Sequence, residues 1–460
     1  MREDRLKAIS LFGRHEYLLH FWNDLTKEER QQLVKQFTSF NMLLLDQAFK
    51  ESAFIPKVVG IEPLDQDCYI VAANIPQEMK DRYWLKGLEA IAKGQVAAVV
   101  LAGGQATRLG VAEPKGTISL GFNLRFVSDS LFALQAARIS RLEDLARAAF
   151  PDTDPHIWWI VMTNSSSEEP TLQHLREMFP VLGLKEKHLI VVTQPSYPCY
   201  DVNGGLFLSS KSSFAVSPNG NGAVYECLKP YRSFFVNHDI RYFHVYSVDN
   251  ILCRVADPQF IGYCINKDVI EKTDPFERVG VICKTLNGPQ VIEYSELPPE
   301  LRDARDEFGR LKFRAGNIAN HFFTREFLHT AANFELPFHR SLKKISFIDR
   351  ATGISIMPAS ENGYKLELFV FDSFKYAKNF HVWEVKRSEE FSPLKNSDDV
   401  GTDCLATCRS DYYSECRRWL LEANIPLKAR RPIFIHPLYS YAGEGLEGFR
   451  LIGVNTDLIP

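Results

Sequence analysis

The chain has 460 residues, of which 45% are apolar and 24% are charged, and its formal net charge is −3. This length predicts two or three domains, and the composition excludes a disordered chain. The small negative charge gives no long-range attraction for nucleic acid or an anionic membrane. No run of about 20 apolar residues predicts a membrane span. The nine cysteines are scattered along the chain, which indicates reduced thiols. We therefore expect a cytoplasmic globular protein with neither a nucleic acid nor a membrane as partner.

Residues 1–92 are predicted to form a mainly helical N-terminal module. Phe21, Trp22 and Leu25 share one helical face, and Thr26 and Glu29 have the spacing of a capping box in front of further apolar positions. We interpret the aromatic pair as core rather than as a ligand site.

The pattern changes in a central domain predicted over residues 93–395. Residues 96–102 form an unbroken apolar run, which is typical of a central parallel strand. Three similar runs follow and alternate with helix-like segments; the runs lie at 157–162, 189–193 and 242–248, and the segments at 128–139 and 171–178. This alternation predicts an α/β fold, a Rossmann-like mixed sheet with crossover helices.

Residues 396–460 are predicted to form a small C-terminal domain with a helix at 410–423. Its cysteines, Cys404, Cys408 and Cys416, lack the paired spacing and the fourth ligand of a structural zinc site. We therefore expect no metal there.

A glycine-rich loop over residues 101–116 follows the first strand of the central domain, at the edge of a parallel sheet where ligands bind. Gly103 and Gly104 let the backbone approach a nucleotide closely. Arg108 offers a planar charged fork for phosphate oxygens, and Lys115 offers a mobile point charge. The loop matches neither the dinucleotide-binding fingerprint nor the P-loop. These residues alone indicate a nucleotide-phosphate site.

This loop, LAGGQATRLGVAEPKG, resembles the signature LxGGxGTRLGxxxPKG of the eukaryotic UDP-N-acetylglucosamine (UDP-N-acetylhexosamine) pyrophosphorylases. The resemblance extends from HEYLLHFWNDL at 15–25 to PLYSYAGEGLE at 437–447. It implies a GT-A-like nucleotidyltransferase core that binds UTP and a sugar 1-phosphate. The chain departs from the family pattern at Ala106 and Ala223, where glycine is usual, and at Asn164, where serine is common.

The resemblance also implies roles for individual residues around the nucleotide. The uridine nucleotide is expected to contact Leu101, Ala102, Gly103, Gly104, Gln194 and Gly220. Arg108, Lys115 and Lys395 are the expected catalytic cations, with Lys395 meeting the sugar-linked phosphate. Asp249, in a Val-Asp-Asn motif, is expected to bind Mg²⁺ or Mn²⁺ because a carboxylate at a strand end suits a hard cation. Asp372 is a second, weaker candidate on the same reasoning.

Sugar recognition, by the same resemblance, falls to Asn221, Gly280, Glu293 and Asn317. Carboxylate and amide side chains suit that role because they exchange hydrogen bonds with hydroxyl groups. Phe369 and Phe371 are predicted to alternate along a strand that ends at Asp372. They would either line a pocket for the acetyl group or pack in the core.

The expected reaction converts UTP and N-acetylglucosamine 1-phosphate into UDP-N-acetylglucosamine and pyrophosphate, in a monomer or a homodimer. Two alternatives stay open at this point. One is a UDP-glucose or broad-specificity UDP-sugar pyrophosphorylase, which needs no acetamido pocket. The other is a non-catalytic nucleotide-sugar sensor. The N-acetylgalactosamine isomer differs only in the orientation of one hydroxyl group, and the sequence does not separate it.

Overall fold

The computed structural model describes residues 2–54, 60–65, 68–104, 106, 109–111, 113–124, 128–265, 280–292, 298–307, 309–427, 432–447 and 458–459. The chain divides into two compact units. Unit 1 combines Met1–Lys57, Gln194–Val224 and Glu335–Asp372, and unit 2 combines Val58–Thr193, Tyr225–Phe334 and Ser373–Pro460. The domain boundaries expected after residues 92 and 395 stay a prediction.

Unit 1 begins with helices, as the sequence predicts; they are α1 (Arg2–Phe12), the 3-10 helix η1 (Gly13–Leu19), α2 (Lys27–Ser39) and α3 (Met42–Glu51). The capping box is confirmed at the start of α2. The Thr26 hydroxyl accepts a hydrogen bond from the Glu29 N–H at 3.2 Å, and the Glu29 carboxylate accepts one from the Thr26 N–H at 2.7 Å. Phe21 and Trp22 are buried in one hydrophobic cluster with Leu33, which confirms that they are core residues.

The strands of unit 1 form one three-stranded antiparallel sheet and three two-stranded antiparallel sheets. The three-stranded sheet contains β15 (His339–Lys343), β18 (Gly363–Glu367) and β6 (Tyr200–Asp201). The two-stranded sheets pair β5 (Ser196–Pro198) with β9 (Val216–Pro218), β7 (Leu208–Ser210) with β8 (Ser213–Phe214), and β16 (Phe347–Ile348) with β17 (Ser355–Ile356).

The prediction that Phe369 and Phe371 lie on a strand that ends at Asp372 is wrong. β18 ends at Glu367, and a 3-10 helix, η9 (Val370–Tyr376), follows it. The Val370 N–H donates to the Asn221 side-chain oxygen at 2.9 Å and is therefore not available to a neighbouring strand. The Asp372 N–H turns back to the Phe369 carbonyl at 3.2 Å. Asp372 therefore lies in a helical turn and not at a strand end.

Unit 2 is built on a five-stranded mixed sheet with the order β14-β10-β2-β3-β4. The parallel strands β10 (Tyr242–Ser247), β2 (Val96–Leu101), β3 (Trp158–Thr163) and β4 (Leu189–Thr193) are those that the apolar runs predict, and β14 (Asn320–Thr324) is antiparallel to β10. Every residue of β2 is buried, because both faces of this strand are covered. The predicted α/β mixed sheet is confirmed.

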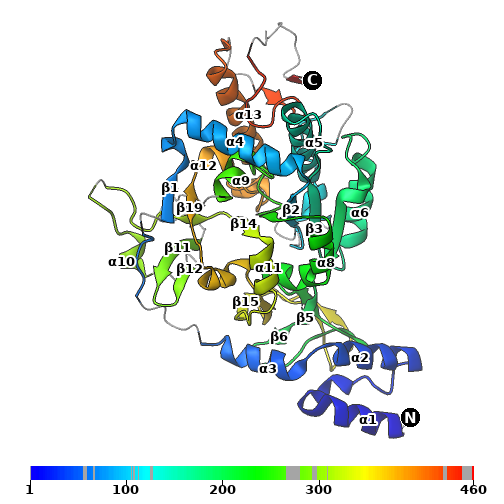
Figure 1. The fold of residues 1–460 in the computed structure, drawn as a ribbon. Helices are drawn as coiled ribbons and strands as arrows, with labels where there is room; N and C mark the ends of the chain where they lie inside the picture. Colours follow the sequence, from blue (N-terminus) through cyan, green and yellow to red (C-terminus); the bar gives the residue numbers. More distant parts are fainter. Residues whose placement is uncertain are drawn as a thin grey trace. The chain divides into compact units, whose positions relative to one another are not determined.

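Helices pack on this sheet at several places in unit 2 (Figure 1). The predicted crossover helices are α5 (Leu131–Ala149) and α6 (Glu168–Met178). α4 (Gln77–Ala92) packs closely on α9 (Pro258–Cys264), because both contribute a glycine to the contact. An ideal Cβ at Gly87 would lie 2.0 Å from the Pro258 carbonyl oxygen, and one at Gly262 would lie 1.8 Å from that of Tyr83. The two helix backbones therefore touch.

The C-terminal helix α13 (Leu405–Glu422) shares a hydrophobic cluster with Leu120, Leu131 and Ile251 of the same unit. The remaining helices of unit 2 are α7 (Val224–Leu228, which starts at the last residue of unit 1), α8 (Arg232–Asn237), α10 (Pro299–Arg302), α11 (Arg325–Ala331) and α12 (Arg387–Glu390). The remaining strands are β1 (Tyr69–Val71), β11 (Gly280–Thr285), β12 (Gly288–Ile292), β13 (Gly316–Asn317), β19 (Val382–Glu384), β20 (Phe434–Ile435) and β21 (Leu458–Ile459). Within the described ranges, no helix has both the length and the apolar character that crossing a bilayer requires.

Candidate active site

The carboxyl edge of the unit 2 sheet brings two predicted site segments to the same place. β2 and β10 are adjacent and parallel, and Leu101 lies opposite Ser247 in their register. The glycine-rich loop leaves the sheet directly after β2, and Asp249 follows β10 by two residues. Because parallel strands end at one edge, this edge is where a ligand of an α/β sheet is expected.

Lys115 and Asp249 form an ion pair at this edge. The Lys115 Nζ lies 3.3 Å from Asp249 Oδ2, and the two side chains are only 15% and 13% exposed. The other carboxylate oxygen accepts a hydrogen bond from the Ser247 hydroxyl at 2.9 Å. Burial pushes the pKa of Asp249 upward, but the positive charges of Lys115 and Lys395 more than offset it and leave the pKa below its usual value. The Lys115 ammonium is thus the direct partner of the Asp249 carboxylate, and the positive charge of Lys395 acts on the same group.

Local contacts position the segments that carry Lys115 and Lys395. Lys115 begins the 3-10 helix η5 (Lys115–Thr117), and a Cβ at the next residue, Gly116, would lie 2.1 Å from the Phe132 ring, so glycine is required for η5 to rest on α5. The backbone N–H of Lys395 donates to the Asp403 carbonyl at 2.7 Å. The Lys395 ammonium lies 5.5 Å from the centre of the Phe391 ring, within range of a cation–π interaction.

The glycine-rich loop is described only in part. Leu101 and Ala102 are buried, whereas an ideal Cβ at Gly104 would meet no atom within 4 Å, so the packing of the chain itself does not demand glycine there. Ala106, the departure from the family pattern, is buried in the hydrophobic cluster under the loop. Arg108 lies outside the described residues.

Asn164 is a site residue that sequence reasoning noted only as a departure. It follows β3, is 3% exposed, and donates a hydrogen bond from Nδ2 to the Gly103 carbonyl at 2.9 Å. Its Oδ1 accepts from the Ser167 N–H at 3.0 Å. Asn164 therefore ties the glycine-rich loop to the end of the neighbouring strand. The available signal was its position two residues after the predicted apolar run at 157–162.

Two of the predicted sugar-binding residues lie together in unit 2. Gly280 of β11 is paired with Asn317 of β13 in an antiparallel register. The Asn317 side-chain oxygen accepts a hydrogen bond from the Ala319 N–H at 3.0 Å. Glu293 lies outside the described residues.

The predicted base and sugar residues of unit 1 form a second group. Gln194 is 4% exposed, and its side-chain oxygen has no hydrogen-bond partner among the described residues. Gly220 has a φ of +91°, and a Cβ there would lie 2.4 Å from the Leu368 carbonyl oxygen, so only glycine fits. Asn221 is held by the Val370 N–H, as described above.

Asp372 belongs to a different arrangement from Asp249. Its Oδ2 lies 2.9 Å from Nε2 of His339, in a hydrogen bond within unit 1. The His339 ring lies 4.5 Å from the Phe369 ring, and Phe369 lies 5.0 Å from Phe371. The two phenylalanines thus lie side by side although no strand carries them.

The donor set at Asp249 fits a magnesium ion that is shared with substrate phosphates. Mg²⁺ commonly takes one or two carboxylates from the protein and its other ligands from phosphate oxygens and water. Asp249 supplies one nearly buried carboxylate at the sheet edge. Among the described residues no group of three or more His, Cys, Asp or Glu side chains could hold a metal by itself.

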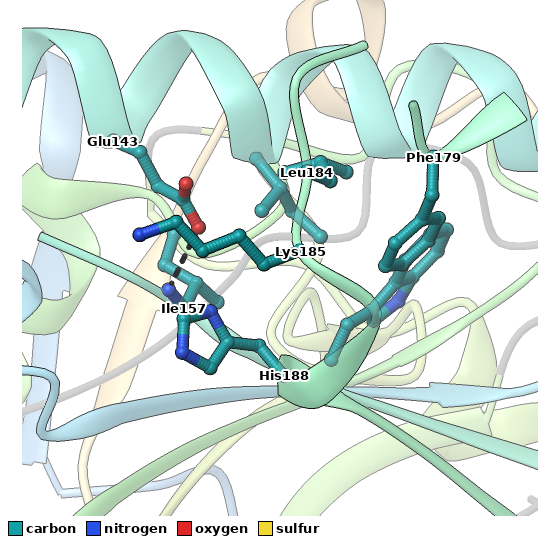
Figure 2. Close-up of a pocket in the computed structure, with 8 residues that line it drawn as sticks. Glu143, Ile157, Phe179, Leu184, Lys185 and His188 are labelled. Carbon is teal, nitrogen blue, oxygen red and sulfur yellow. Dashed lines mark hydrogen bonds between the residues drawn. The ribbon is translucent and has the colours of Figure 1, made fainter. Parts of the chain in front are cut away.

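A small cavity lies at the opposite edge of the same sheet and is not the active site. Ile157 and His188, which line it, directly precede β3 and β4. Its volume is about 10 Å³, which is room for about one water molecule. Figure 2 shows the Glu143 carboxylate accepting a hydrogen bond from the Ile157 N–H, at 3.0 Å. Burial raises the pKa of Glu143 to about 7.

Comparison with known proteins places the chain in a family. The family model described as UTP–glucose-1-phosphate uridylyltransferase matches residues 37–434. A Caenorhabditis elegans protein named "Probable UDP-N-acetylglucosamine pyrophosphorylase" is 41% identical over 456 residues, which cover 96% of this chain and 94% of that protein. The Saccharomyces cerevisiae UDP-N-acetylglucosamine pyrophosphorylase is 35% identical over 470 residues, with 96% of each chain covered.

A solved structure supports the same placement. The crystal structure of the UDP-N-acetylglucosamine pyrophosphorylase of Trypanosoma brucei, in complex with an inhibitor, matches with a TM-score of 0.82 and 27% identity, and covers 96% of this chain and 94% of that one. The resemblance stated from the sequence is therefore confirmed along nearly the whole chain. The chain belongs to the UTP–glucose-1-phosphate uridylyltransferase family, and within it to the UDP-N-acetylglucosamine pyrophosphorylases.

Proposed function

We propose that the protein transfers the uridylyl group of UTP to N-acetylglucosamine 1-phosphate and releases pyrophosphate. The observation that carries this proposal is the Lys115–Asp249 pair at the carboxyl edge of the sheet, with Lys395 acting on the same carboxylate. The family placement supports the same reaction, because the matched relatives are named for it.

In the proposed reaction the sugar phosphate is itself the nucleophile. One of its oxygens forms a bond to the α-phosphorus of UTP, while the bond from that phosphorus to the departing pyrophosphate breaks and pyrophosphate keeps the electron pair. A phosphate near neutral pH needs no base to deprotonate it, so the protein contributes positioning and charge neutralisation. Lys115 and Lys395 supply positive charge, and Arg108 is the third proposed cation.

Asp249 is the proposed ligand of Mg²⁺ or Mn²⁺. When bound, such an ion neutralises the charge of the phosphate groups and holds them in line. Asp372 is the weaker candidate, because its carboxylate is already paired with His339. Asp249 would hold the cation, and Lys115, whose Nζ lies 3.3 Å from Asp249 Oδ2, would supply positive charge to the substrate phosphates.

The other residue assignments are part of the same proposal. Leu101, Ala102, Gly103, Gly104, Gln194 and Gly220 are the proposed contacts of the uridine nucleotide. Asn221, Gly280, Glu293 and Asn317 are the proposed contacts of the sugar. We also propose that the protein is a monomer or a homodimer. We propose a cytoplasmic location because all nine cysteines are free thiols, which a reducing compartment maintains.

A pyrophosphate-release assay with UTP and Mg²⁺ across a panel of sugar 1-phosphates tests the function. We expect N-acetylglucosamine 1-phosphate to give a kcat/KM at least 10²-fold above that of glucose 1-phosphate, because a site that hydrogen-bonds an acetamido group is left with unpaired polar groups by a sugar without one. Equal values would favour a broad UDP-sugar pyrophosphorylase. Binding of UTP without any release of pyrophosphate would favour a sensor.

A further inference from the structure

Asn250 directly follows Asp249, but its side chain points to a segment 140 residues further along the chain. The Asn250 Nδ2 donates to the Glu390 carbonyl at 2.6 Å. Its Oδ1 accepts from the Ser392 N–H at 2.9 Å and from the Leu252 N–H at 3.2 Å. The residue is 2% exposed, so this amide is occupied by protein groups and is not a ligand contact.

These bonds reinforce a short backbone bridge between the same two segments. Asn250 and Pro393 form an antiparallel β-bridge. The Ile251 N–H donates to the Ser392 carbonyl at 3.1 Å, and the Leu394 N–H donates to the Asp249 carbonyl at 2.8 Å. Both hydrogen bonds of this bridge are formed by the neighbouring residues, and Asn250 and Pro393 are its non-hydrogen-bonded pair. The Asn250 side chain supplies two more bonds at this position.

The Asp249 side of the bridge has further support of its own. Two buried side chains of α5 hold it from behind: Gln135 donates to the Val248 carbonyl at 3.0 Å, and Arg138 donates to the Ile251 carbonyl at 2.9 Å. The opposite segment is tied to α13 through the Ser392 hydroxyl, which donates to Asp411 at 2.7 Å. Asn250 is thus a buried side chain that joins this loop to the segment that ends in Lys395, beside the ion pair of Arg254 with Glu390 at 3.7 Å.

We propose that Asn250 is a positioning residue that sets the placement of Lys395 relative to Asp249. The proposal rests on the proposed function, in which these two residues face the substrate phosphates. Leu394, whose N–H donates to the Asp249 carbonyl, directly precedes Lys395. A change in the bridge therefore moves the cation and the carboxylate relative to each other. A displacement of about 1 Å in such a site costs on the order of 10²-fold in rate.

The chemistry of the bridge requires an amide at this position. Asn250→Asp keeps the shape of the side chain and both bonds that its oxygen accepts. It places a carboxylate oxygen against the Glu390 carbonyl oxygen, at the position that the Asn250 amide nitrogen occupies in the wild-type protein. Asn250→Ala removes the three bonds without adding a charge. Asn362→Asp is a matched control, because the Asn362 amide makes the same two-sided contact with the Ile345 N–H at 2.7 Å and the Ile345 carbonyl at 3.0 Å, in unit 1.

A double-mutant cycle with Lys395→Ala separates positioning from general loss of stability. We expect Asn250→Asp and Asn250→Ala to lower kcat/KM for N-acetylglucosamine 1-phosphate at least tenfold in the wild-type background. In the Lys395→Ala background the same changes should cost less than threefold, because the residue they place is gone. Asn362→Asp should change kcat/KM less than twofold. Equal losses in both backgrounds would show a merely structural role and overturn the proposal.

Hydrogen exchange of the full-length protein supplies a readout that does not depend on turnover. Amides of residues 391–397 should exchange at least tenfold faster in the folded Asn250 variants than in wild type, and those of β3 should not change. Unchanged protection of 391–397 would overturn the proposal. If the wild-type protein releases no pyrophosphate, the proposed function fails by itself, and the exchange rates still decide whether Asn250 holds this segment.

Discussion

Replacing Lys115 tests the proposed chemistry most directly. Lys115→Ala removes the ammonium that lies 3.3 Å from Asp249 in a pair of nearly buried side chains. Removal of one preorganised group that stabilises developing charge costs about 10² to 10³ in kcat, or about 3 to 4 kcal/mol. Lys395 also acts on Asp249 and remains in the variant. We therefore expect a fall in kcat near the lower limit, about 10²-fold.

The assay is pyrophosphate release at saturating UTP and N-acetylglucosamine 1-phosphate, with Mg²⁺. Lys115→Arg should recover part of the rate, since it keeps the charge but not the compact shape of the ammonium. Lys284→Ala is the matched control: Lys284 pairs with Asp65 at 2.8 Å, but the two side chains are 46% and 59% exposed. It should leave kcat unchanged. A kcat for Lys115→Ala within threefold of wild type would refute the assignment of Lys115.

Two further predictions concern stability. The Asp46 carboxylate lies 3.0 Å from His15 and 2.5 Å from Arg14. Burial by itself raises the pKa of Asp46, but these two partners outweigh it and lower the pKa to about 2. Because the folded pKa is depressed, its stabilisation is present above the unfolded value near 4 and is lost as the pH falls through about 2. After allowance for solvent screening, Asp46→Asn should lower the free energy of unfolding at pH 7 by about 1 to 2 kcal/mol. Urea titrations should show a smaller difference at pH 3, and a difference that did not change with pH would contradict this cause. Gly262→Ala should lower the Tm and reduce the free energy of unfolding by about 3 kcal/mol, because the new Cβ would lie 1.8 Å from a backbone oxygen of α4. An unchanged Tm in calorimetry would contradict the close approach of α4 and α9.

Much of the candidate site could be predicted because its parts are local in the sequence. The apolar runs marked β2 and β10, and the residues just after each run had to leave the sheet at its carboxyl edge. The sequence therefore predicted the glycine-rich loop at this edge and Asp249 at the end of its own strand, and the structure shows that Lys115 and Asp249 meet there. Lys395 was assigned by family resemblance alone, because nothing in its immediate sequence indicates where the segment 390–395 lies.

Other features depended on contacts that no local pattern contains. Phe369 and Phe371 alternate as strand residues do, but the Val370 N–H bonds to Asn221, 149 residues away, and a 3-10 helix forms instead. Gly87 and Gly262 appear in the sequence as unremarked glycines, although a Cβ on either would collide with the backbone of the other helix.

By itself, the sequence determined the class of fold, the sheet edge that carries the site and the family, because strand periodicity and loop motifs are written in consecutive residues. Only the tertiary structure decided that unit 1 is assembled from three separate segments and that Asp372 pairs with His339. It also decided that Asn250 joins the Asp249 loop to the segment before Lys395. The physical reason is the same in each case: a hydrogen bond or close contact between distant residues depends on where the whole chain places them, which local spacing does not specify.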